Sequence, residues 1–498
     1  MLFVGIVIPI IRHYQIKAAV NRYRAELKAK GEPMELLQAI PSPVPTNQNS
    51  APLFLKAISL FVTNTTVLNT NQPPNMRMIA PGKAMVGWKQ SNIQDSSIDA
   101  TNSWSDIHAA LKEEQSALNL LHTLPQKPLF DFKLHYADGF GMMKLSPLAK
   151  VKNTVRKLAA SATDNLHSGD TKVAARDIQA MLALVNGFSH DRILISELVR
   201  MSMAGITQAT TWEFLQSSEI NDEQLAELQC GWANTEFLQT FENAMAIERT
   251  VGSIEMSKLR DHGFKSYFEP LEKMGLFNTE ESLWSGLKVK YKSVMWRYWW
   301  SYPDELRELK GVQYVMDATR QARTNYSFFA LSAELKIKIE SLGIKPDEDD
   351  SFWFSDPANA DFHFIFSSST VAFKTAFNKV LKIEAAKQLT ITAIALKRYQ
   401  LKHGNYPGQL SELTPEFFAS VPRDPVDGNL LRYRRNTDGT FLLYSIGEDG
   451  VDNGGNPALK SGSSSKSSWW QHRDALDWVW PQPATPAEVQ FFYDHPPK

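Results

Sequence analysis

The stretch TKVAARDIQAMLALVNG, residues 171–187, decides the fold class. Its apolar side chains are spaced by one, three and four residues, at Ala174, Ile178, Met181, Leu182 and Val185. This spacing is typical of an amphipathic helix that buries one face in a core. Asp170 before the stretch is a favoured N-cap residue, and Gly187 predicts the end of the helix. The stretch therefore predicts a helical core.

The sequence on both sides of this stretch continues in the same pattern. A helix is expected to begin at Ser146-Pro147, where a capping serine precedes a proline suited to the first helical position. Another helix is expected from about Asp191 to Leu215, and Asn221 with Gln224 is typical of a capping box. We therefore predict that residues 146–350 form an α-helical domain.

The composition is that of an ordinary globular protein. Of 498 residues, 43% are hydrophobic and 21% are charged, which argues against disorder. The 53 basic residues nearly balance the 54 acidic ones, so a nucleic-acid partner bound through a broad basic surface is not expected. The single cysteine, Cys230, excludes an internal disulfide and a zinc site built from several cysteines. We expect this thiol to be buried on a helical face beside Trp232.

Residues 1–30 are predicted to form a hydrophobic anchor followed by an amphipathic stem. The run LFVGIVIPII, Leu2–Ile11, is apolar but shorter than the about 20 residues that span a bilayer. It would reach that length if apolar residues preceded it or if residues 14–20 also entered the bilayer. The stem is basic, with Arg12, Lys17, Arg22, Arg24, Lys28 and Lys30 against the single acid Glu26. The alternative is an N-terminal helix buried in the core.

Residues 31–145 are predicted to be a linker followed by a mixed region with short α and β elements. A short helix is expected at Leu53–Val62, and Ser105 is expected to cap another. In Leu129–Tyr136 apolar residues alternate with polar ones, which predicts a strand.

The aromatic run VMWRYWWSY, Val294–Tyr302, has two interpretations. If its tryptophans are exposed, they form a belt at a membrane interface or a platform that stacks on carbohydrate. If they are buried, they form an aromatic seam in the core of the helical domain. The helical spacing of Trp284, Tyr291 and Trp296 favours the buried seam.

The last quarter of the chain has a different pattern. A long helix is expected over Val371–Leu401, ended by His403-Gly404. Strands at Leu430–Arg434 and Phe441–Ile446, joined by a hairpin turn, predict a small antiparallel sheet. The glycine-rich and acidic loop GEDGVDNGG, residues 447–455, follows.

These elements complete the expected fold, which is mainly α. A large α-helical body is closed by an α+β domain over residues 365–460. A Ser-rich insert and a C-terminal tail are expected over residues 461–498.

Four motifs, in this order, resemble the C-terminal half of the major pseudopilins of type II secretion. They are Leu396–Tyr399 (LKRY), Gly404–Pro407 (GNYP), Pro422–Pro425 (PRDP) and Tyr444–Gly450 (YSIGEDG). The resemblance implies a pseudopilin-like long helix and small sheet, a loop that helps to bind calcium, and a secretion-linked role. The resemblance implies that Asp449 is one of the calcium ligands in that loop.

Two features depart from the family pattern. The family's helix continues from an N-terminal membrane segment with a prepilin peptidase site, and no such segment directly precedes Val371. Val426-Asp427 stand where the family has Trp-Gly. Assembly into a pilus by the usual helix packing is therefore not expected. The remainder, for example Asn49–Leu53 and Ala80–Met85, resembles large uncharacterised membrane-anchored bacterial proteins, which adds no activity.

The acidic loop is a candidate calcium site. Ca²⁺ takes six to eight oxygen ligands, and Asp449, Asp452 and Asn453 offer side-chain oxygens on a loop that can bend around an ion. Glu448 is a further candidate, and Asp474 or Asp477 could close the site. The alternative is a turn in which these side chains bond their own backbone.

No catalytic residues can be assigned. HExxH, Walker A, GxGxxG and GxSxG patterns are absent from the sequence. We therefore expect a non-enzymatic envelope protein with a structural or protein-interaction role, anchored through its N-terminus and contacting unknown envelope proteins. The alternatives are a hydrolase whose site is assembled from distant residues and a carbohydrate-binding module that uses Trp296–Trp300.

The expected location is the cell membrane, with most of the chain periplasmic or extracellular. The basic residues after the apolar run favour a cytoplasmic body by the positive-inside rule. The pseudopilin resemblance favours the outer side, and the charges alone leave the topology open.

Overall fold

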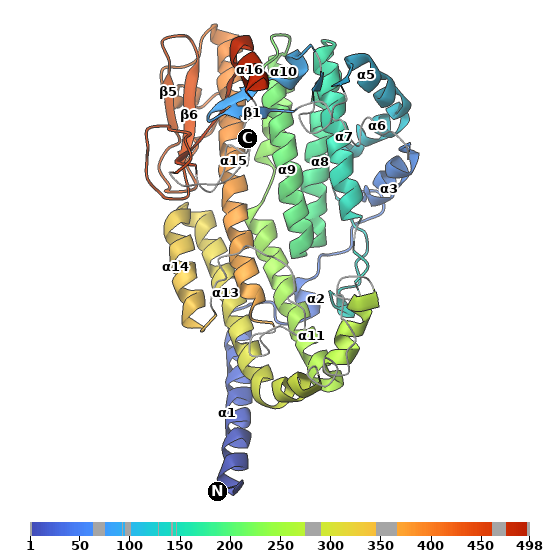
Figure 1. Cartoon of the computed structure of the whole chain (residues 1–498), viewed down its shortest axis with the longest axis vertical. Helices are drawn as coiled ribbons and strands as arrows, with labels where there is room; N and C mark the ends of the chain where they lie inside the picture. Colours follow the sequence, from blue (N-terminus) through green and yellow to red (C-terminus); the bar gives the residue numbers. More distant parts are fainter. Residues whose placement is uncertain are drawn as a thin grey trace.

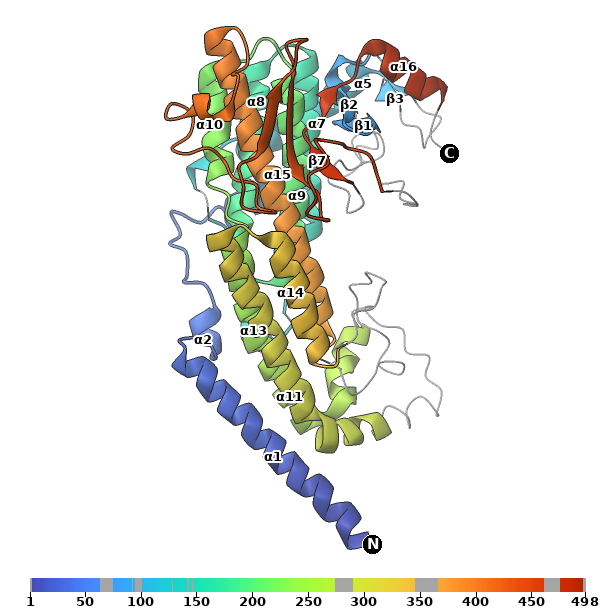
Figure 2. The ribbon, with the colours of Figure 1, turned by 90° about the vertical axis from the view of Figure 1, so that its left-hand side faces the viewer.

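The computed structural model describes residues 2–62, 75–91, 93–94, 101–127, 129–140, 143–145, 147–273, 290–344, 366–460 and 475–495. Over these residues the protein is mainly α-helical with small sheets, which confirms the predicted fold class (Figure 1). The molecule is elongated. Its long helices form an upper and a lower tier, and one helix extends beyond the lower tier (Figure 2).

The upper tier consists of α7 (Leu148–His167), α8 (Thr171–Gly187), α9 (Leu194–Leu215) and α10 (Asp222–Ala233). α7, α8 and α9 pack against one another, α10 packs against α8, and the apolar stripe of α8 lies in the core. α7, α8 and α10 each bury one face and expose charged residues on the other. α9 has no exposed residue, and its charged side chains Glu197, Arg200 and Glu213 are buried.

The ends of these helices follow the sequence signals closely. The Asp170 carboxylate accepts the N–H of Val173, and Asn221 with Gln224 forms the predicted capping box of α10. α9 begins at Leu194 rather than near Asp191, because Phe188–Asp191 forms a 3₁₀ turn before it.

The lower tier consists of α11 (Leu238–Lys273), α13 (Ser301–Asn325) and α14 (Phe328–Ser341). A π-helical turn, Trp296–Trp300, leads directly into α13. α1 (Leu2–Ala29) packs against α13.

The predicted C-terminal helix is α15 (Ser369–His403), and it joins the two tiers. Its 35 residues extend about 52 Å. Its first half lies against α13 and α14, and its second half lies against α9 and α10 (Figure 1). Gly404 ends it with a φ of 78°, the left-handed cap that the sequence predicts.

A glycine lies at one close contact between α13 and α15. A Cβ atom at Gly311 of α13 would lie 2.5 Å from Cγ2 of Thr370 on α15. Only a residue without a side chain allows α13 and α15 to approach so closely at this point.

The predicted C-terminal sheet has a third strand that comes from beyond the Ser-rich insert. β5 (Arg432–Arg435) pairs antiparallel with β6 (Phe441–Ile446), and β6 pairs with β7 (Asp477–Val479). The chain then forms β8 (Gln482–Pro483) and α16 (Pro486–Asp494). Part of the predicted tail is therefore built into the fold.

β8 connects the C-terminus to the N-terminal part of the chain. It pairs with β2 (Lys83–Met85), which pairs with β1 (Arg77–Ala80). The Trp212 indole of α9 donates to the Pro481 carbonyl at 2.9 Å, which fixes this sheet to the upper tier.

The remaining N-terminal elements are short. They are α2 (Leu36–Ala39), α3 (Ala51–Leu60), α5 (Trp104–Glu113), α6 (Gln115–Leu121), β3 (Ile93–Gln94) and β4 (Thr101–Asn102). Two predictions for this region are wrong. The cap of α5 is Ser103, whose hydroxyl accepts the N–H of Asp106, and Ser105 lies inside the helix.

The predicted strand Leu129–Tyr136 does not form. Only Leu129 makes a β-bridge, to Asn49, and Tyr136 begins a 3₁₀ turn. Phe130 and Tyr136 are buried as the alternation requires, but the intervening segment bonds no neighbouring strand. Alternating burial arises here in an irregular segment, in which Lys133 has a left-handed φ of 54° and Phe130 and Phe132 pack on Phe54 of α3.

Candidate functional site

The N-terminal helix is the part of the molecule best placed for contact with something outside it. Figures 1 and 2 both show α1 leaving the body beside the lower tier, with its N-terminus farthest from the rest of the chain. Val20 and Leu27 are buried, whereas Ile11 is 50% exposed and Tyr14 is 65% exposed. The second half of α1 is therefore a packed element and the part around Ile11 is open to solvent.

Within the described residues, no helix is both long and apolar enough to cross a bilayer.

A buried polar network holds the segment that follows α1. The Glu32 carboxylate accepts from Arg249 at 3.2 Å, from Gln313 at 3.0 Å and from Arg320 at 3.0 Å. Burial by itself raises the pKa of Glu32, but the bonds from Arg320 and Gln313 and the charge of Arg249 outweigh it and lower that pKa to about 2. Arg320 also bonds Glu242 of α11. One carboxylate thus ties the end of the stem to α11 and α13.

The sequence gives little sign of this network. Glu32 lies in a segment predicted to be a linker, and its partners are more than 200 positions away. A second pair of contacts acts closer to the open end, where Arg24 and Arg260 both bond Glu305. α1 is therefore fixed to the body along its second half.

The aromatic run lies beside the open part of α1. Trp296 is buried and donates its indole N–H to Asp304 at 3.0 Å, as the core interpretation predicts. Tyr291, Tyr298 and Trp299 are exposed, so that interpretation is wrong for them. Trp284 lies outside the described residues. His13 of α1 bonds the Tyr298 carbonyl at 2.7 Å.

The two exposed rings do not lie in one plane. The Tyr298 and Trp299 rings meet edge to face, with an angle of 79° between their planes. This pair therefore does not present two coplanar aromatic faces.

The three predicted calcium ligands lie in the loop after β6 but bond to different partners. Asp452 accepts from the Tyr444 hydroxyl at 2.9 Å and from the N–H of Gly454 at 3.0 Å. Asn453 donates its amide to the Val451 carbonyl. Asp449 lies 3.5 Å from the ammonium of Lys460.

A guanidinium stands among the carboxylates of this region. Arg432 of β5 bonds Asp424 at 2.7 Å, Asp427 at 2.5 Å and Asp452 at 3.2 Å. Burial raises the pKa of Asp424 to about 6, although hydrogen bonds from Ser445 and backbone amides oppose the rise. Arg432 therefore supplies the positive charge that this acidic cluster needs.

Asp477, which the sequence offers as a further ligand of a calcium site, instead accepts hydrogen bonds from the loop backbone. It accepts the N–H groups of Asn453, Gly455 and Asn456 at 2.9 to 3.1 Å. In the described part of the chain, no three His, Cys, Asp or Glu side chains gather as a metal site would need. Asp474 lies outside the described residues.

Other buried carboxylates act as structural anchors. Asp304 accepts the N–H groups of Phe366 and Ser367, which fixes the start of α15 to α13. Glu213 of α9 accepts the N–H groups of Met76 and Gly87, which flank the β1–β2 hairpin. Burial raises the pKa of Glu213 to about 8.

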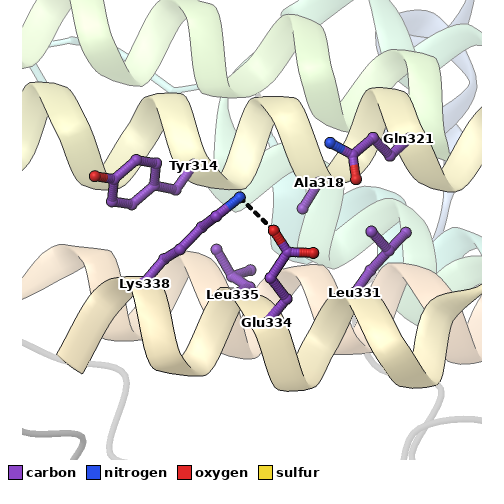
Figure 3. Close-up of a pocket in the computed structure, with 7 residues that line it drawn as sticks. All are labelled: Tyr314, Ala318, Gln321, Leu331, Glu334, Leu335 and Lys338. Atoms are coloured by element: carbon purple, nitrogen blue, oxygen red, sulfur yellow. Dashed lines mark ion pairs between the residues drawn. The ribbon is translucent and has the colours of Figure 1, made fainter. Parts of the chain in front are cut away.

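A hollow between α13 and α14 is too small for a substrate. It measures about 10 Å³, roughly the space of one water molecule. Figure 3 shows Tyr314 and Gln321 at its ends and the ion pair of Lys338 with Glu334, 2.6 Å long, across it. Nothing in this hollow favours the hydrolase alternative.

Cys230 corrects one further prediction, because its thiol is exposed rather than buried. The buried side of α10 carries Leu225, Leu228 and Trp232, and Cys230 lies on the opposite side.

Comparisons of the chain with protein-family models, with curated proteins and with solved structures give no match.

Proposed function

We propose that the protein is a membrane-anchored structural or protein-interaction component of the bacterial cell envelope. The observation that carries the proposal is the placement of α1. Its apolar run Leu2–Ile11 leads away from the body, while its second half is packed on α13. The Glu32 network makes this attachment rigid, so a force on the anchor reaches the helical body directly.

A secretion-linked role remains part of this proposal. The order of α15, its glycine cap, the antiparallel β5–β6 pair and the acidic loop supports the pseudopilin resemblance. The burial of α15 argues against packing into a pilus, because α9, α10 and α13 already cover this helix. Calcium binding by Asp449, Asp452 and Asn453 is likewise a proposal, and an ion would have to replace the Arg432–Asp452 contact.

The proposal is tested by fractionating cells that express the full chain. We expect the protein to sediment with membranes and to resist extraction by high salt. A variant lacking residues 2–11 should become extractable, whereas Leu37→Lys, on the exposed surface of α2, should not change the distribution. A full chain that stays in the soluble fraction would overturn the proposal.

Protease treatment of intact spheroplasts then gives the side of the membrane. If the protease cleaves the protein within residues 366–460 while the spheroplasts are intact, the result supports a body on the outer side of the membrane. Protection until the membrane is opened would reverse the orientation and remove the secretion link.

A further inference from the structure

Four exposed residues form an apolar patch, here called the aromatic patch, on the helical segment before α13. They are Tyr291, Val294, Tyr298 and Trp299, with exposed fractions of 61%, 52%, 54% and 44%. The first three are spaced by three and four residues, which places them along one face of the helical segment 290–300. Trp299 extends this face and contacts Tyr298.

The aromatic patch lies where the anchor leaves the body. His13 of α1 bonds the Tyr298 carbonyl, and its ring lies 5.0 Å from that of Tyr302. The apolar run Leu2–Ile11 therefore starts beside the patch and continues about 15 Å beyond it. The hydrocarbon core of a bilayer is about 30 Å thick, so a membrane that holds this run also reaches the level of the patch.

The charges around the patch are positive. Residues 11–25 include Arg12 and Lys17 and no acid, and residues 290–303 include Lys290 and Arg297 and no acid. Arg12, Lys17, Lys290 and Arg297 are exposed. Arg297 lies over the Tyr298 ring at 5.8 Å, and Lys17 lies over the Tyr302 ring at 5.7 Å. Basic residues near a membrane surface are attracted by anionic headgroups.

We propose that the aromatic patch docks on the surface of an anionic lipid bilayer as a second membrane contact beside the anchor. Tyrosine and tryptophan favour this interface because their rings have an apolar body and a polar end. The exposed cations pair with headgroup phosphates at the same level. This inference rests on the proposed anchoring of α1 and adds that the lower tier lies directly on the membrane.

The test is the binding of the full chain to vesicles. We compare vesicles of phosphatidylcholine with vesicles that also contain phosphatidylglycerol, and measure the bound fraction by flotation. Tyr298→Ala combined with Trp299→Ala should weaken partitioning about tenfold, because two half-exposed rings no longer enter the interface. The control is Phe329→Ala with Ile337→Ala, which removes exposed apolar side chains from α14 and should not change binding.

A charge variant separates the lipid headgroup from the apolar interface. Lys290→Gln with Arg297→Gln should weaken binding to the anionic vesicles and leave binding to the neutral vesicles unchanged. The same loss should follow when the salt concentration is raised. Equal binding of the wild type to both vesicle types would overturn the headgroup part of the inference.

The anchor and the patch can fail independently in this experiment. A chain lacking residues 2–11 should keep weak binding to anionic vesicles, and the Tyr298–Trp299 double substitution should remove it. If the double substitution changes nothing while the deletion abolishes binding, the inference fails and the proposed anchor stands. If the full chain does not bind at all, both fail.

If the double substitution instead lowers the molar mass measured by light scattering without lipid, the patch is a contact between copies and the inference is overturned.

Discussion

Glu32 is the residue on which the attachment of the stem depends most. It is nearly buried against Arg249, whose side chain is fully shielded from solvent. Glu32→Gln removes the negative charge and leaves two arginines facing each other, so we expect a loss of about 3 kcal/mol in the free energy of unfolding. Urea unfolding at pH 7 measures this loss. The control is Glu35→Gln, which removes the surface ion pair with Lys28 at the N-cap of α2 and should leave the unfolding midpoint nearly unchanged.

Glu32 also predicts a dependence on acid. Its folded pKa of about 2 lies below the ordinary 4.5, so its stabilisation is present above pH 4.5 and is lost as the pH falls through 2. Glu32→Gln should therefore reduce the fall in stability between pH 4.5 and pH 2. An unchanged acid profile in the variant would show that other carboxylates cause the fall.

Glu213 predicts the opposite dependence. Burial raises its pKa from 4.5 to about 8, so its contribution is complete below pH 4.5 and is lost as the pH rises through 8. Glu213→Gln should lessen the loss of stability between pH 5 and pH 9 by up to about 4 kcal/mol. Burial also raises the pKa of Glu248 to about 8. Glu248 therefore contributes to the same loss of stability at high pH, and Glu248→Gln should remove its contribution. Urea titrations at the two pH values test both, and parallel profiles for wild type and variants would contradict the argument.

At the scale of elements, the contact of α13 with α15 decides whether a glycine-to-alanine substitution stabilises or destabilises the protein. Gly311→Ala brings a methyl group within 2.5 Å of Thr370, and the cost of overpacking, about 1–3 kcal/mol, exceeds the gain of about 1 kcal/mol in helix propensity. We expect net destabilisation. Gly252→Ala on α11 meets no atom within 4 Å and should stabilise the protein by up to about 1 kcal/mol. Thermal unfolding of the two variants should therefore shift in opposite directions.

The sequence predicts the helices well because their signals are local. The α8 stripe, the Asp170 cap and the Gly404 stop each lie within a few residues of the structure they specify. Leu129–Tyr136 was misassigned because a strand also needs a partner, and alternation says nothing about one. The β2–β8 pair joins residues about 400 positions apart, which no local pattern can indicate.

The candidate sites were harder to predict for the same reason. The sequence identifies the acidic loop, but Arg432 reaches it from another strand and pairs with three carboxylates. The aromatic run was assigned as one unit, whereas its helix turns Trp296 into the core and leaves Trp299 outside. Glu32 gives no local signal at all.

At the scale of the molecule, the C-terminal strands complete both the C-terminal sheet and the N-terminal one. A chain that ends at residue 474 loses β7 and β8, and with them the Trp212–Pro481 bond. We expect this truncation to lower the melting temperature by more than 10 °C, or to prevent cooperative unfolding, because it opens the core of the upper tier. A chain that ends at residue 484 keeps both strands and loses only α16, and its melting temperature should stay close to that of the full chain. Calorimetry of the two truncations checks this, and equal effects would contradict it.

The pairing of β2 with β8 has a consequence for biosynthesis. Lys83 leaves the ribosome some 400 residues before its partner Gln482 exists. At 5–20 residues per second, the edge of β2 waits roughly 20–80 s for the C-terminus. The Trp212 indole lies 269 positions before Pro481 and waits roughly 13–54 s. During that time the nascent upper tier presents an open strand edge, which chaperones can recognise. A prematurely terminated chain keeps that unpaired edge permanently. Quality control can therefore distinguish complete from incomplete chains by whether β8 covers the edge of β2.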